Sequence, residues 1–398
     1  MITPAEAHEL ISEHLFKPEK ETLSFDKTRG RISAEPILAD RDLPPFNRVT
    51  KDGVALHTAS FDLVNREGVI ETVRAAGDPQ YRLEDPEKAV EIMTGSPLPL
   101  GTDAVVMYEE IKREENRIQL QEEVTPGQNI HPQGQDAKKG DVLLKAGSRM
   151  GSAEIGLLAS VGKTELQVHS VPKVAIVATG NELVLPHEEP APHQIRMSNV
   201  YSLQAGLEEM GIPCSIQIIR DDKELLRQDL ASLLEQNDLL LCSGGVSKGR
   251  YDYLPEVLPE LGIQKVFHRV RQKPGKPLWF GADRTKGKVV FALPGNPAST
   301  FSNFILYVLP WLRKSLGRET KAETVVMKEF FKNPSDLWRH IQVKLVSEQG
   351  QLKAELLKGN GSGDLVSLAQ ADGLISIPPQ SAVKANEPVA YQSFQLIL

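Results

Sequence analysis

Residues 238–249 read DLLLCSGGVSKG, and this stretch decides the fold. The apolar run at 239–242 predicts a strand that is buried on both faces of a sheet. Two glycines, Gly244 and Gly245, follow the run, and glycine permits a sharp turn with positive φ angles. Because a helical pattern resumes at 253–261, the stretch is typical of one strand-turn-helix unit of a parallel α/β sheet.

The same alternation of strand and helix continues on both sides of this stretch. From residue 173 onward the two patterns take turns, which is the signature of parallel strands joined by right-handed crossovers. We therefore predict a central α/β domain over 171–318. The expected strands are 174–178, 215–219, 239–242, 265–270 and 288–293, and the expected helices are 199–210, a helix capped by Asp222, 253–261 and 297–316.

The flanking segments predict further domains, because 398 residues are too many for one ordinary core. Residues 41–140 are rich in Pro, Gly and short apolar runs, which predicts an inserted β domain. Thr3 begins a capping-box helix, and a second helical pattern at 151–160 is expected to pack against it. The predicted fold class is thus multidomain α/β, with a discontinuous helical domain at 1–40 and 141–170, the β insertion at 41–140, the parallel-sheet domain at 171–318 and a C-terminal β domain at 319–398.

Charge and composition exclude several classes of protein. The formal net charge of −7 provides no basic field for nucleic acid or an anionic membrane, so any anion site must be built locally. No apolar run reaches the about 20 residues that span a bilayer, and the N-terminus does not resemble a signal peptide. Cys214 and Cys242 form no metal-ligand pattern and are expected to be buried, reduced residues of a cytoplasmic protein.

The polar residues of the central domain cluster where its predicted strands end. In an open parallel sheet, ligands bind outside the carboxyl ends of the strands. Five loops that carry Gly, carboxylate, hydroxyl and Lys groups should therefore meet at one edge. They are Thr179-Gly180-Asn181-Glu182, Arg220-Asp221-Asp222, the loop from Ser243 to Gly249, Lys273-Pro274-Gly275-Lys276-Pro277 and Pro294-Gly295-Asn296-Pro297.

The glycine loop can hold an anion. Backbone N–H groups at Gly244 and Gly245 would form a nest, and the N-terminus of the next helix would add positive charge. Taken alone, the loop is equally compatible with a plain strand-to-helix turn. It matches neither the Walker pattern nor GxGxxG, which disfavours a nucleoside triphosphatase or a dinucleotide dehydrogenase.

Charged residues stand beside this loop. Lys273 and Lys276 lie in a segment stiffened by proline, and two fixed cations suit phosphate or another oxyanion, although a solvated basic loop is the alternative. Glu182 and Asp252 are expected to serve the ligand or Mg²⁺, which takes one or two carboxylates together with phosphate oxygens. Asp222 is better explained as a helix N-cap.

Two further features are ambiguous from the residues alone. The turn at 294–297 is either a rigid ligand contact or only the start of a helix. His131 and His268 are single histidines, which are more often surface or core residues than ligands.

Several long motifs closely resemble the MoeA family, the molybdopterin molybdenumtransferases, which include the E domain of gephyrin. The resemblance runs over essentially the whole chain with its motifs in the family's order. They are PPFNRVTKDGVAL (44–56), MTGSPLPLGTDAVVMYEE (93–110), QGQDAKKGDVLLKAGSRM (133–150), ATGNEL (178–183), SGGVSKGRYDY (243–253), KPGKP (273–277) and LPGNPAS (293–299).

This resemblance implies a function and an assembly. Family enzymes insert molybdate into adenylylated molybdopterin with Mg²⁺ and release AMP. Members are elongated homodimers, with a cleft between the α/β domain of one subunit and the inserted domain of the other. The resemblance also implies other molybdenum cofactor biosynthesis proteins as partners, with small molecules as the only other ligands.

The matching motifs carry the family's site residues onto this chain. Catalytic roles are expected for Asp52, Thr94, Glu182, Asp252, Lys273 and Lys276. Metal binding is expected for Glu182, Asp221 and Asp252. Binding of the pterin substrate is expected for Asp136, Thr179, Gly180, Ser243, Gly244, Gly245, Ser247, Pro294, Gly295, Asn296, Arg339 and Ser362.

Two departures from the family pattern keep alternatives open. Val54 stands where the family usually has Tyr, and Ile130-His131-Pro132-Gln133 replaces a segment that often carries arginines. The second change removes fixed positive charge expected near the oxyanion. The alternatives are a non-catalytic member that binds pterin or acts as a scaffold, and a molybdopterin adenylyltransferase, against which the SGGVS loop and the flanking domains argue.

Overall fold

The computed structural model describes residues 1–246, 252–318 and 323–395. The chain divides into two compact units that are described separately below. The first unit comprises Met1–Leu23, Thr28–Ile32 and Gln167–Leu398, and the second comprises Ser24–Lys27 and Ser33–Leu166.

The core of the first unit is a six-stranded sheet. Its order is β16–β13–β17–β21–β20–β18, and β16, β13, β17 and β21 are parallel. β13 and β17 are buried along their whole length, as expected for parallel strands covered on both faces. The strands are β13 (Val174–Thr179), β16 (Cys214–Ile219), β17 (Leu239–Ser243), β18 (Gln264–His268), β20 (Trp279–Asp283) and β21 (Lys288–Leu293).

One strand of this sheet was not predicted, and the sheet is not wholly parallel. β20 lies between β21 and β18 and is antiparallel to both of them. β18 consequently points the same way as the parallel strands, so the segment 273–277 that follows it still lies at their carboxyl edge. The expectation of one edge for all five loops therefore holds, while the expectation of an unbroken parallel sheet is wrong.

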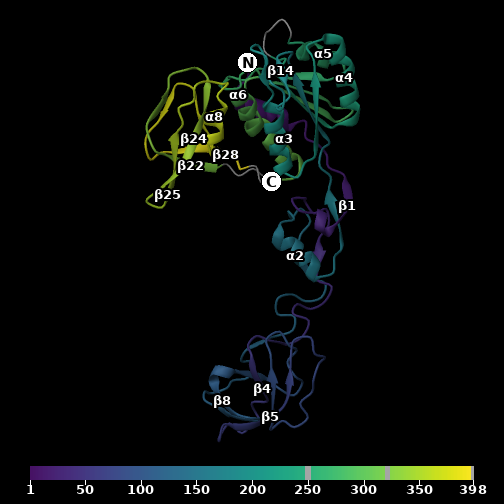
Figure 1. Ribbon diagram of the computed structural model, residues 1–398, viewed down its shortest axis with the longest axis vertical. Coiled ribbons are helices and arrows are strands. Elements are labelled where there is room, and N and C mark those ends of the chain that lie inside the picture. The colour runs from purple at the N-terminus through teal and green to yellow at the C-terminus, as the bar shows by residue number, and fades with distance from the viewer. Residues whose placement is uncertain (247–251, 319–322, 396–398) are drawn as a thin grey trace. The chain divides into compact units, whose positions relative to one another are not determined.

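Helices cover both faces of the sheet (Figure 1). α4 and α5 pack on the face that presents Val177 and Cys242. α3, α6 and α7 pack on the opposite face with Ile176 and Leu241, because successive strand residues alternate between faces. The helices are α3 (Asn199–Glu209), α4 (Lys223–Gln236), α5 (Leu254–Glu260), α6 (Pro297–Asn303) and α7 (Leu309–Ser315), and a π-helix, η3 (Phe304–Val308), joins α6 to α7.

Predicted capping residues begin two helices. Asp222 accepts hydrogen bonds from the N–H groups of Glu224 and Leu225, which confirms its role as the N-cap of α4. In α1 (Pro4–Ser12), Thr3 and Glu6 form the expected capping box.

The two helices predicted near the N-terminus are both present. α1 contacts α7, and Ala7 and Ile11 join the core of the α/β sheet. The pattern at 151–160 forms α2 (Ser152–Ser160), which belongs to the second unit and contacts the short helix η1 (Phe25–Lys27) there. The expected packing of α1 and α2 on each other stays a prediction.

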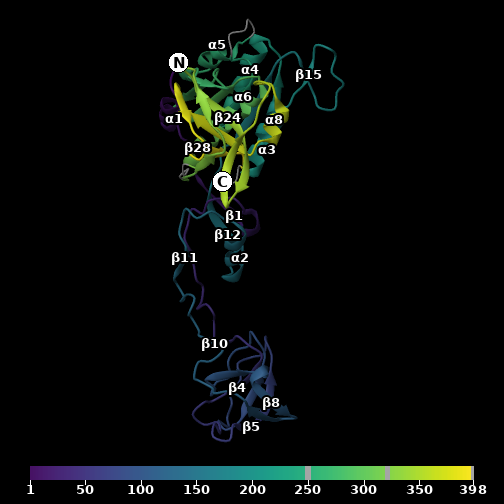
Figure 2. The same ribbon diagram turned by 90° about the vertical axis from the view of Figure 1, so that its left-hand side faces the viewer.

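The C-terminal strands of the first unit close on themselves. The order is β24–β25–β22–β28–β26, and β26 also pairs with β24. α8 (Leu365–Gln370) contacts both α6 and β24, and Figure 2 shows these strands, in green to yellow, beside the helices. The strands are β22 (Glu323–Met327), β24 (Trp338–Glu348), β25 (Gln351–Leu356), β26 (Gly373–Ile377) and β28 (Pro388–Ser393), with the short pair β23 (Phe331–Asn333) and β27 (Ser381–Val383).

The second unit is built mainly of strands, as predicted for an inserted β domain. Its six-stranded sheet has the order β7–β4–β6–β5–β9–β8 around a core that includes Val54 and Leu56. The sheet strands are β4 (Gly53–Leu56), β5 (Glu67–Arg74), β6 (Ala89–Ile92), β7 (Ala104–Met107), β8 (Ile111–Glu114) and β9 (Arg117–Leu120). The short elements are β2 (Ile37–Leu38), β3 (Arg48–Val49), η2 (Tyr108–Glu110), β10 (Ile130–His131) and β11 (Val142–Leu144).

Segments β1 (Lys20–Ser24) and β12 (Glu165–His169) lie where the chain passes from one unit to the other. The finer domain boundaries at 40/41, 140/141, 170/171 and 318/319 stay a prediction. Within the described ranges, no helix has the length and apolar composition needed to cross a bilayer.

Both cysteines are free, and burial raises the pKa of Cys214 to about 11 and that of Cys242 to about 12. Cys242 is buried as predicted, whereas Cys214 is only half-buried, so the prediction of burial is wrong for Cys214. Thiols with such high pKa values are poor nucleophiles, which agrees with the structural role predicted for both.

Candidate functional site

The two central strands of the α/β sheet end where its topology reverses. From β13 the chain continues to β16 on one side, and from β17 it continues to β18 on the other side. A crevice forms at such a reversal, outside the carboxyl ends of the two strands. Thr179 ends β13 and Ser243 ends β17, so both residues flank this crevice.

The glycine loop after β17 is shaped by its close approach to Thr179. Gly244 and Gly245 have φ angles of +98° and +69°, which residues with side chains rarely adopt. A Cβ atom on Gly244 would lie 2.6 Å from the carbonyl oxygen of Thr179, and one on Gly245 would lie 3.1 Å from the Thr179 hydroxyl. Glycine is therefore needed at Gly244 both for its φ angle and for space.

One backbone group of this loop differs from the prediction. The N–H of Gly244 donates to the carbonyl of Leu293 at 3.1 Å, so it is directed into the fold and away from a ligand. His268 holds the other end of the loop, because its Nε2 lies 2.9 Å from the carbonyl oxygen of Val246. This structural contact agrees with the expectation that His268 is not a ligand.

Asn199, the first residue of α3, ties the loops together, and sequence reasoning missed it. Its Nδ2 donates to Ser243 Oγ at 2.9 Å, to the carbonyl of Gly295 at 2.7 Å and to Thr300 Oγ1 at 3.3 Å. Within the described residues, its buried Oδ1 and the buried hydroxyl of Thr179 have no hydrogen-bond partner. Two buried polar atoms beside the crevice can therefore still accept a ligand's hydrogen bonds.

A carboxylate wall, formed by Glu182, Asp221 and Asp252, lies on one side of the crevice. Burial raises the pKa of Asp221, and the negative charges of Glu182 and Asp252 raise it further, while a hydrogen bond from the Asn181 N–H opposes the rise. The three carboxylates are thus close enough to repel one another, and a cation placed among them would relieve that repulsion.

Three cationic residues, Lys273, Lys276 and Arg339, also line the crevice, and we call them the cationic wall. β19 (Gln272–Lys273) pairs with β24 so that Lys273 is the direct neighbour of Arg339. Both lysines are exposed and Arg339 is half-buried, and none of the three forms an ion pair with a described residue. Their positive charge therefore remains available to an anionic ligand.

The turn after β21 joins this site to the C-terminal strands. Asn296 Nδ2 donates to Ser362 Oγ at 2.9 Å, and the Ala298 N–H donates to the Ser362 carbonyl at 2.9 Å. Thr300 Oγ1 also holds the turn, because it donates a hydrogen bond to the Pro294 carbonyl. The Asn296 amide, which was expected to face a ligand, is therefore engaged by Ser362.

These elements enclose one cavity of about 880 Å³ within the first unit. Apolar side chains, among them Met197, Leu337 and Ile341, line it together with the charged walls. His340 and Arg196 also line it and were not predicted; burial lowers the pKa of His340 to about 3. The predicted residues in its lining are Thr179, Gly180, Glu182, Asp221, Ser243, Gly244, Gly245, Asp252, Lys273, Lys276, Pro294, Gly295, Asn296, Arg339 and Ser362.

The second unit brings two other predicted residues together. The Thr94 N–H donates to Asp52 Oδ1 at 2.6 Å, and this backbone bond is the main cause that lowers the pKa of Asp52. Gly53 must be glycine, because a Cβ there would lie 1.8 Å from the carbonyl oxygen of Val106. The Asp-Gly pair therefore fixes an ionised carboxylate at the start of β4.

Asp136 in the same unit belongs to a chain of polar contacts. His131 Nε2 lies 3.0 Å from Asp136 Oδ1, and Arg48 Nη2 lies 3.0 Å from His131 Nδ1. Arg48, from the neighbouring strand β3, therefore places a positive charge beside His131. Sequence reasoning missed this residue because the pairing of β3 with β10 brings it there.

Comparisons with known proteins agree with these features. Residues 2–162 match the MoeA N-terminal region (domain I and II), 175–314 match a probable molybdopterin binding domain, and 324–394 match the MoeA C-terminal region (domain IV). A molybdopterin molybdenumtransferase of Synechocystis sp. is 36% identical over 97% of this chain and 98% of its own length. The chain belongs to the MoeA family of molybdopterin molybdenumtransferases. These enzymes are transferases of molybdenum cofactor biosynthesis, and the resemblance seen in the motifs is confirmed.

Further members of the MoeA family are similar over most of the chain. A molybdopterin molybdenumtransferase of Staphylococcus epidermidis is 32% identical over 95% of this chain and 91% of its own length. Two crystal structures of a molybdopterin biosynthesis MoeA protein from Pyrococcus horikoshii cover 99% of this chain and 99% and 100% of their own, at 31% and 26% identity, with TM-scores of 0.79 and 0.81. The predicted multidomain α/β fold is therefore that of the MoeA family.

The individual roles assigned by analogy with the MoeA family stay predictions. Ser247 lies outside the described residues. Leaving out 247–251, 319–322 and 396–398, no three His, Cys, Asp or Glu side chains lie close enough together to hold a metal ion by themselves. Any metal at Glu182, Asp221 and Asp252 would thus need ligand atoms from a substrate.

Proposed function

We propose that this chain inserts molybdate into adenylylated molybdopterin with release of AMP. The observation that carries the proposal is a single cavity lined by both the carboxylate wall and the cationic wall. A ligand with a planar apolar part, phosphate groups and a bound cation matches such a lining. The match to a probable molybdopterin binding domain over 175–314 supports the same assignment.

Mg²⁺ fits the carboxylate wall of this cavity. The ion usually takes one or two carboxylates together with phosphate oxygens, which agrees with carboxylates that do not form a complete metal site alone. Glu182, Asp221 and Asp252 are the residues that would hold it. When bound, Mg²⁺ supplies positive charge to the phosphate oxygens of the adduct.

The protein side chains act mainly through charge. As the bond to AMP breaks, negative charge grows on the phosphoryl oxygens, and the fixed ammonium groups of Lys273 and Lys276 stabilise it. Arg339 holds the oxyanion beside them. The Gly244 and Gly245 backbone packs closely against Thr179 and leaves the space beside it to the adduct. The dithiolene sulfurs of the pterin replace molybdate oxygen, which leaves as water, so no cysteine of the protein takes part.

We further propose that the protein acts as a homodimer. The family resemblance implies that Asp52, Thr94 and Asp136 of a partner subunit complete the cavity. A cytoplasmic location and transfer of the product to other proteins of molybdenum cofactor biosynthesis belong to the same proposal. The two unpaired cysteines support a reducing compartment.

Single-turnover AMP release tests the reaction. Adenylylated molybdopterin, molybdate and Mg²⁺ are mixed with wild-type protein and with the Asp52→Ala and Lys276→Ala variants. We expect release in the wild type and a fall of about 10²–10³ in each variant. Unchanged release in both variants would refute the roles, and binding without any turnover in the wild type would favour the scaffold function instead.

Subunit mixing tests the shared site. Asp52→Ala and Lys276→Ala chains are each unfolded, combined in equal amounts and refolded. A symmetric dimer with shared sites should then regain about a quarter of wild-type activity, because random pairing makes one site in four intact. No recovery would show that each cavity depends on residues of a single chain.

A further inference from the structure

A cluster of three buried side chains lies beneath the segment that carries the two lysines. Gln272 and Asn303 are completely buried, and Gln272 Nε2 donates to Asn303 Oδ1 at 2.8 Å. The Tyr307 hydroxyl, also completely buried, donates to Gln272 Oε1. We define these three residues as the buried amide cluster.

The buried amide cluster holds the backbone of the lysine segment at its middle residue. Asn303 Nδ2 donates to the carbonyl of Gly275 at 3.1 Å, and Gln272 Nε2 donates to the same oxygen at 3.3 Å. Gly275 has a φ angle of +81°, and a Cβ there would lie 2.4 Å from Asn303 Oδ1. The turn between the lysines therefore fits directly against the cluster.

The helix places two members of the cluster on one face. Asn303 ends α6, and Tyr307 follows four residues later in η3, so both side chains face the lysine segment. At the N-terminus of α6, Asn296 and Ala298 make the hydrogen bonds to Ser362 described above. The cluster thus ties the lysine segment to the helix whose N-cap, Asn296, also lines the cavity.

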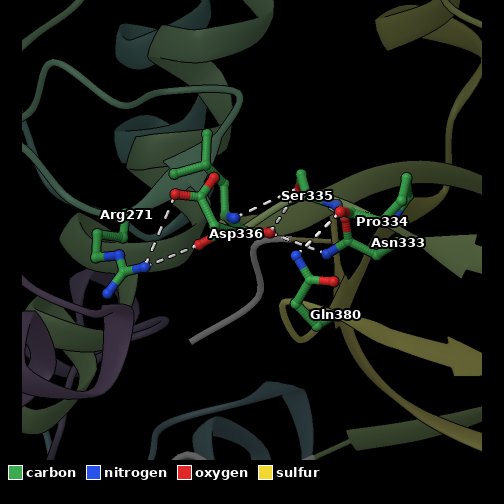
Figure 3. A network of polar contacts seen from close by, with 7 residues as sticks. Arg271, Asn333, Pro334, Ser335, Asp336 and Gln380 are labelled. Carbon is green, nitrogen blue, oxygen red and sulfur yellow. Dashed lines mark hydrogen bonds and ion pairs between the residues drawn. The ribbon is translucent and has the colours of Figure 1, made fainter.

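A second network lies directly before β19 and β24 (Figure 3). Arg271, which precedes β19, donates to the carbonyl of Asp336 at 3.2 Å, in the turn that leads into β24. The buried Asn333 holds that turn by donating to the carbonyls of Leu337 at 2.9 Å and Pro378 at 2.7 Å. The start of the pairing between β19 and β24 is therefore anchored.

Burying an amide side chain costs free energy unless each of its polar atoms has a hydrogen-bond partner. A buried network whose polar atoms are all paired holds its side chains in a single arrangement. The lysines themselves have no partner among the described residues that would set their direction. We propose that Gln272, Asn303 and Tyr307 are positioning residues that direct Lys273 and Lys276 into the cavity. The inference rests on the proposed function insofar as the lysines serve an oxyanion there.

A double-mutant cycle tests this proposal. Asn303→Ala and the milder Tyr307→Phe are each made in the wild-type protein and in Lys276→Ala, and kcat/KM for AMP release is measured. Small displacements of catalytic groups cost up to about 10²-fold, so we expect Asn303→Ala to lower kcat/KM by about 10–10² and Tyr307→Phe by several-fold. In Lys276→Ala both effects should shrink to about threefold or less, because one of the two positioned groups is gone and only Lys273 remains.

Two controls separate positioning from general damage. Ser302→Ala alters a buried neighbour on α6 whose hydroxyl has no hydrogen-bond partner in the described part of the chain, and it should leave kcat/KM unchanged. Leu230→Ala creates a cavity in the core on the other face of the sheet and should lower Tm without lowering kcat. Equal losses from Asn303→Ala with and without Lys276, or activity losses that merely follow Tm in all variants, would overturn the proposal.

Binding of inorganic pyrophosphate, measured across the same double-mutant cycle, tests the positioning role independently of the AMP-release reaction. Calorimetry measures the Kd of the wild type and of the three variants of the Asn303 and Lys276 cycle. We expect Asn303→Ala to weaken binding about tenfold when Lys276 is present and clearly less in Lys276→Ala, where Lys273 alone remains to be positioned. If the wild-type protein releases no AMP but the Asn303→Ala effect on pyrophosphate binding still depends on Lys276, the proposed function fails and the positioning role stands. If the Asn303→Ala effect does not depend on Lys276, the positioning role fails.

Discussion

The glycine loop and the lysine segment meet the same cavity in opposite ways. At Gly244 and Gly245 the absence of side chains lets the backbone approach Thr179. Lys273 and Lys276 line the cavity as charged residues, while the backbone between them is held by two buried amides. The glycine loop contributes by leaving space that side chains would fill, and the lysine segment contributes positive charge from a backbone that is held in place.

This difference shows which residues each loop depends on for its conformation. The glycine loop requires glycine itself, because its φ angles disfavour side chains and Thr179 leaves no room for a Cβ at Gly244. The lysine segment depends on residues 28 to 35 positions away, since Asn303 and Tyr307 form its support. The glycine loop should therefore be most sensitive to changes in its own residues, whereas the lysine segment should also be sensitive to changes at its distant supports.

The largest expected effect tests charge in the lysine segment. Lys276→Ala should lower the rate of AMP release by about 10²–10³, because a fixed cation near the developing charge is lost. The measurement is single-turnover release at saturating substrate. Lys265→Ala, an exposed lysine of β18 that does not line the cavity, should change the rate less than about twofold. Equal rates in wild type and Lys276→Ala would show that the charge of the lysine segment does not contribute to the reaction.

The next prediction tests space in the glycine loop. Gly244→Ala should lower kcat/KM by about 10², because a Cβ 2.6 Å from the Thr179 carbonyl oxygen forces the loop away from the substrate. Gly287→Ala is the matched control, since Gly287 also has a positive φ of +65° but nothing within 4 Å of its Cβ position. A similar loss in both variants would assign the effect to backbone strain instead of space.

A smaller effect should appear as acid sensitivity beside the lysine segment. Burial lowers the pKa of His340 to about 3, so the folded state favours the neutral ring and the unfolded state binds the proton first. The stability from this group is complete above about pH 6.5 and is lost as the pH falls toward 3. At pH 5 the loss is about 2 kcal/mol, since one pKa unit corresponds to about 1.4 kcal/mol.

Urea unfolding at pH 7 and pH 5 measures this loss. His340→Gln should reduce the difference in unfolding free energy between the two pH values by about 2 kcal/mol. The exposed His187→Gln serves as the control and should leave the difference unchanged. An identical pH dependence in wild type and His340→Gln would contradict the prediction.

The smallest effect concerns the carboxylate wall. Asp221→Asn should raise Tm slightly at pH 7, because it removes a partly buried negative charge near Glu182 and Asp252. It should also weaken the apparent affinity for Mg²⁺ by about tenfold in the AMP-release assay. A stabilised protein with unchanged Mg²⁺ dependence would remove Asp221 from the proposed metal site.

Much of the fold and the site could be predicted from the sequence. The strand and helix patterns, the Asp222 N-cap and the five loops at one edge follow from contacts between residues near each other in the chain. β20 was missed because Trp279–Asp283 follows directly after a proline-rich loop and reverses direction. Asn199 was missed because a residue that begins a helix gives no sign of its three partners.

The sequence by itself determined where the chain must turn, which strands are buried and which loops carry charge, because backbone φ preferences and hydrophobic periodicity act over a few residues. Only the tertiary structure decided that the Gly244 N–H binds Leu293, that Ser362 engages Asn296 and that buried amides support the lysines. Those pairings join residues far apart in the chain, and burial selects them, since an amide removed from water must find a partner wherever packing places one.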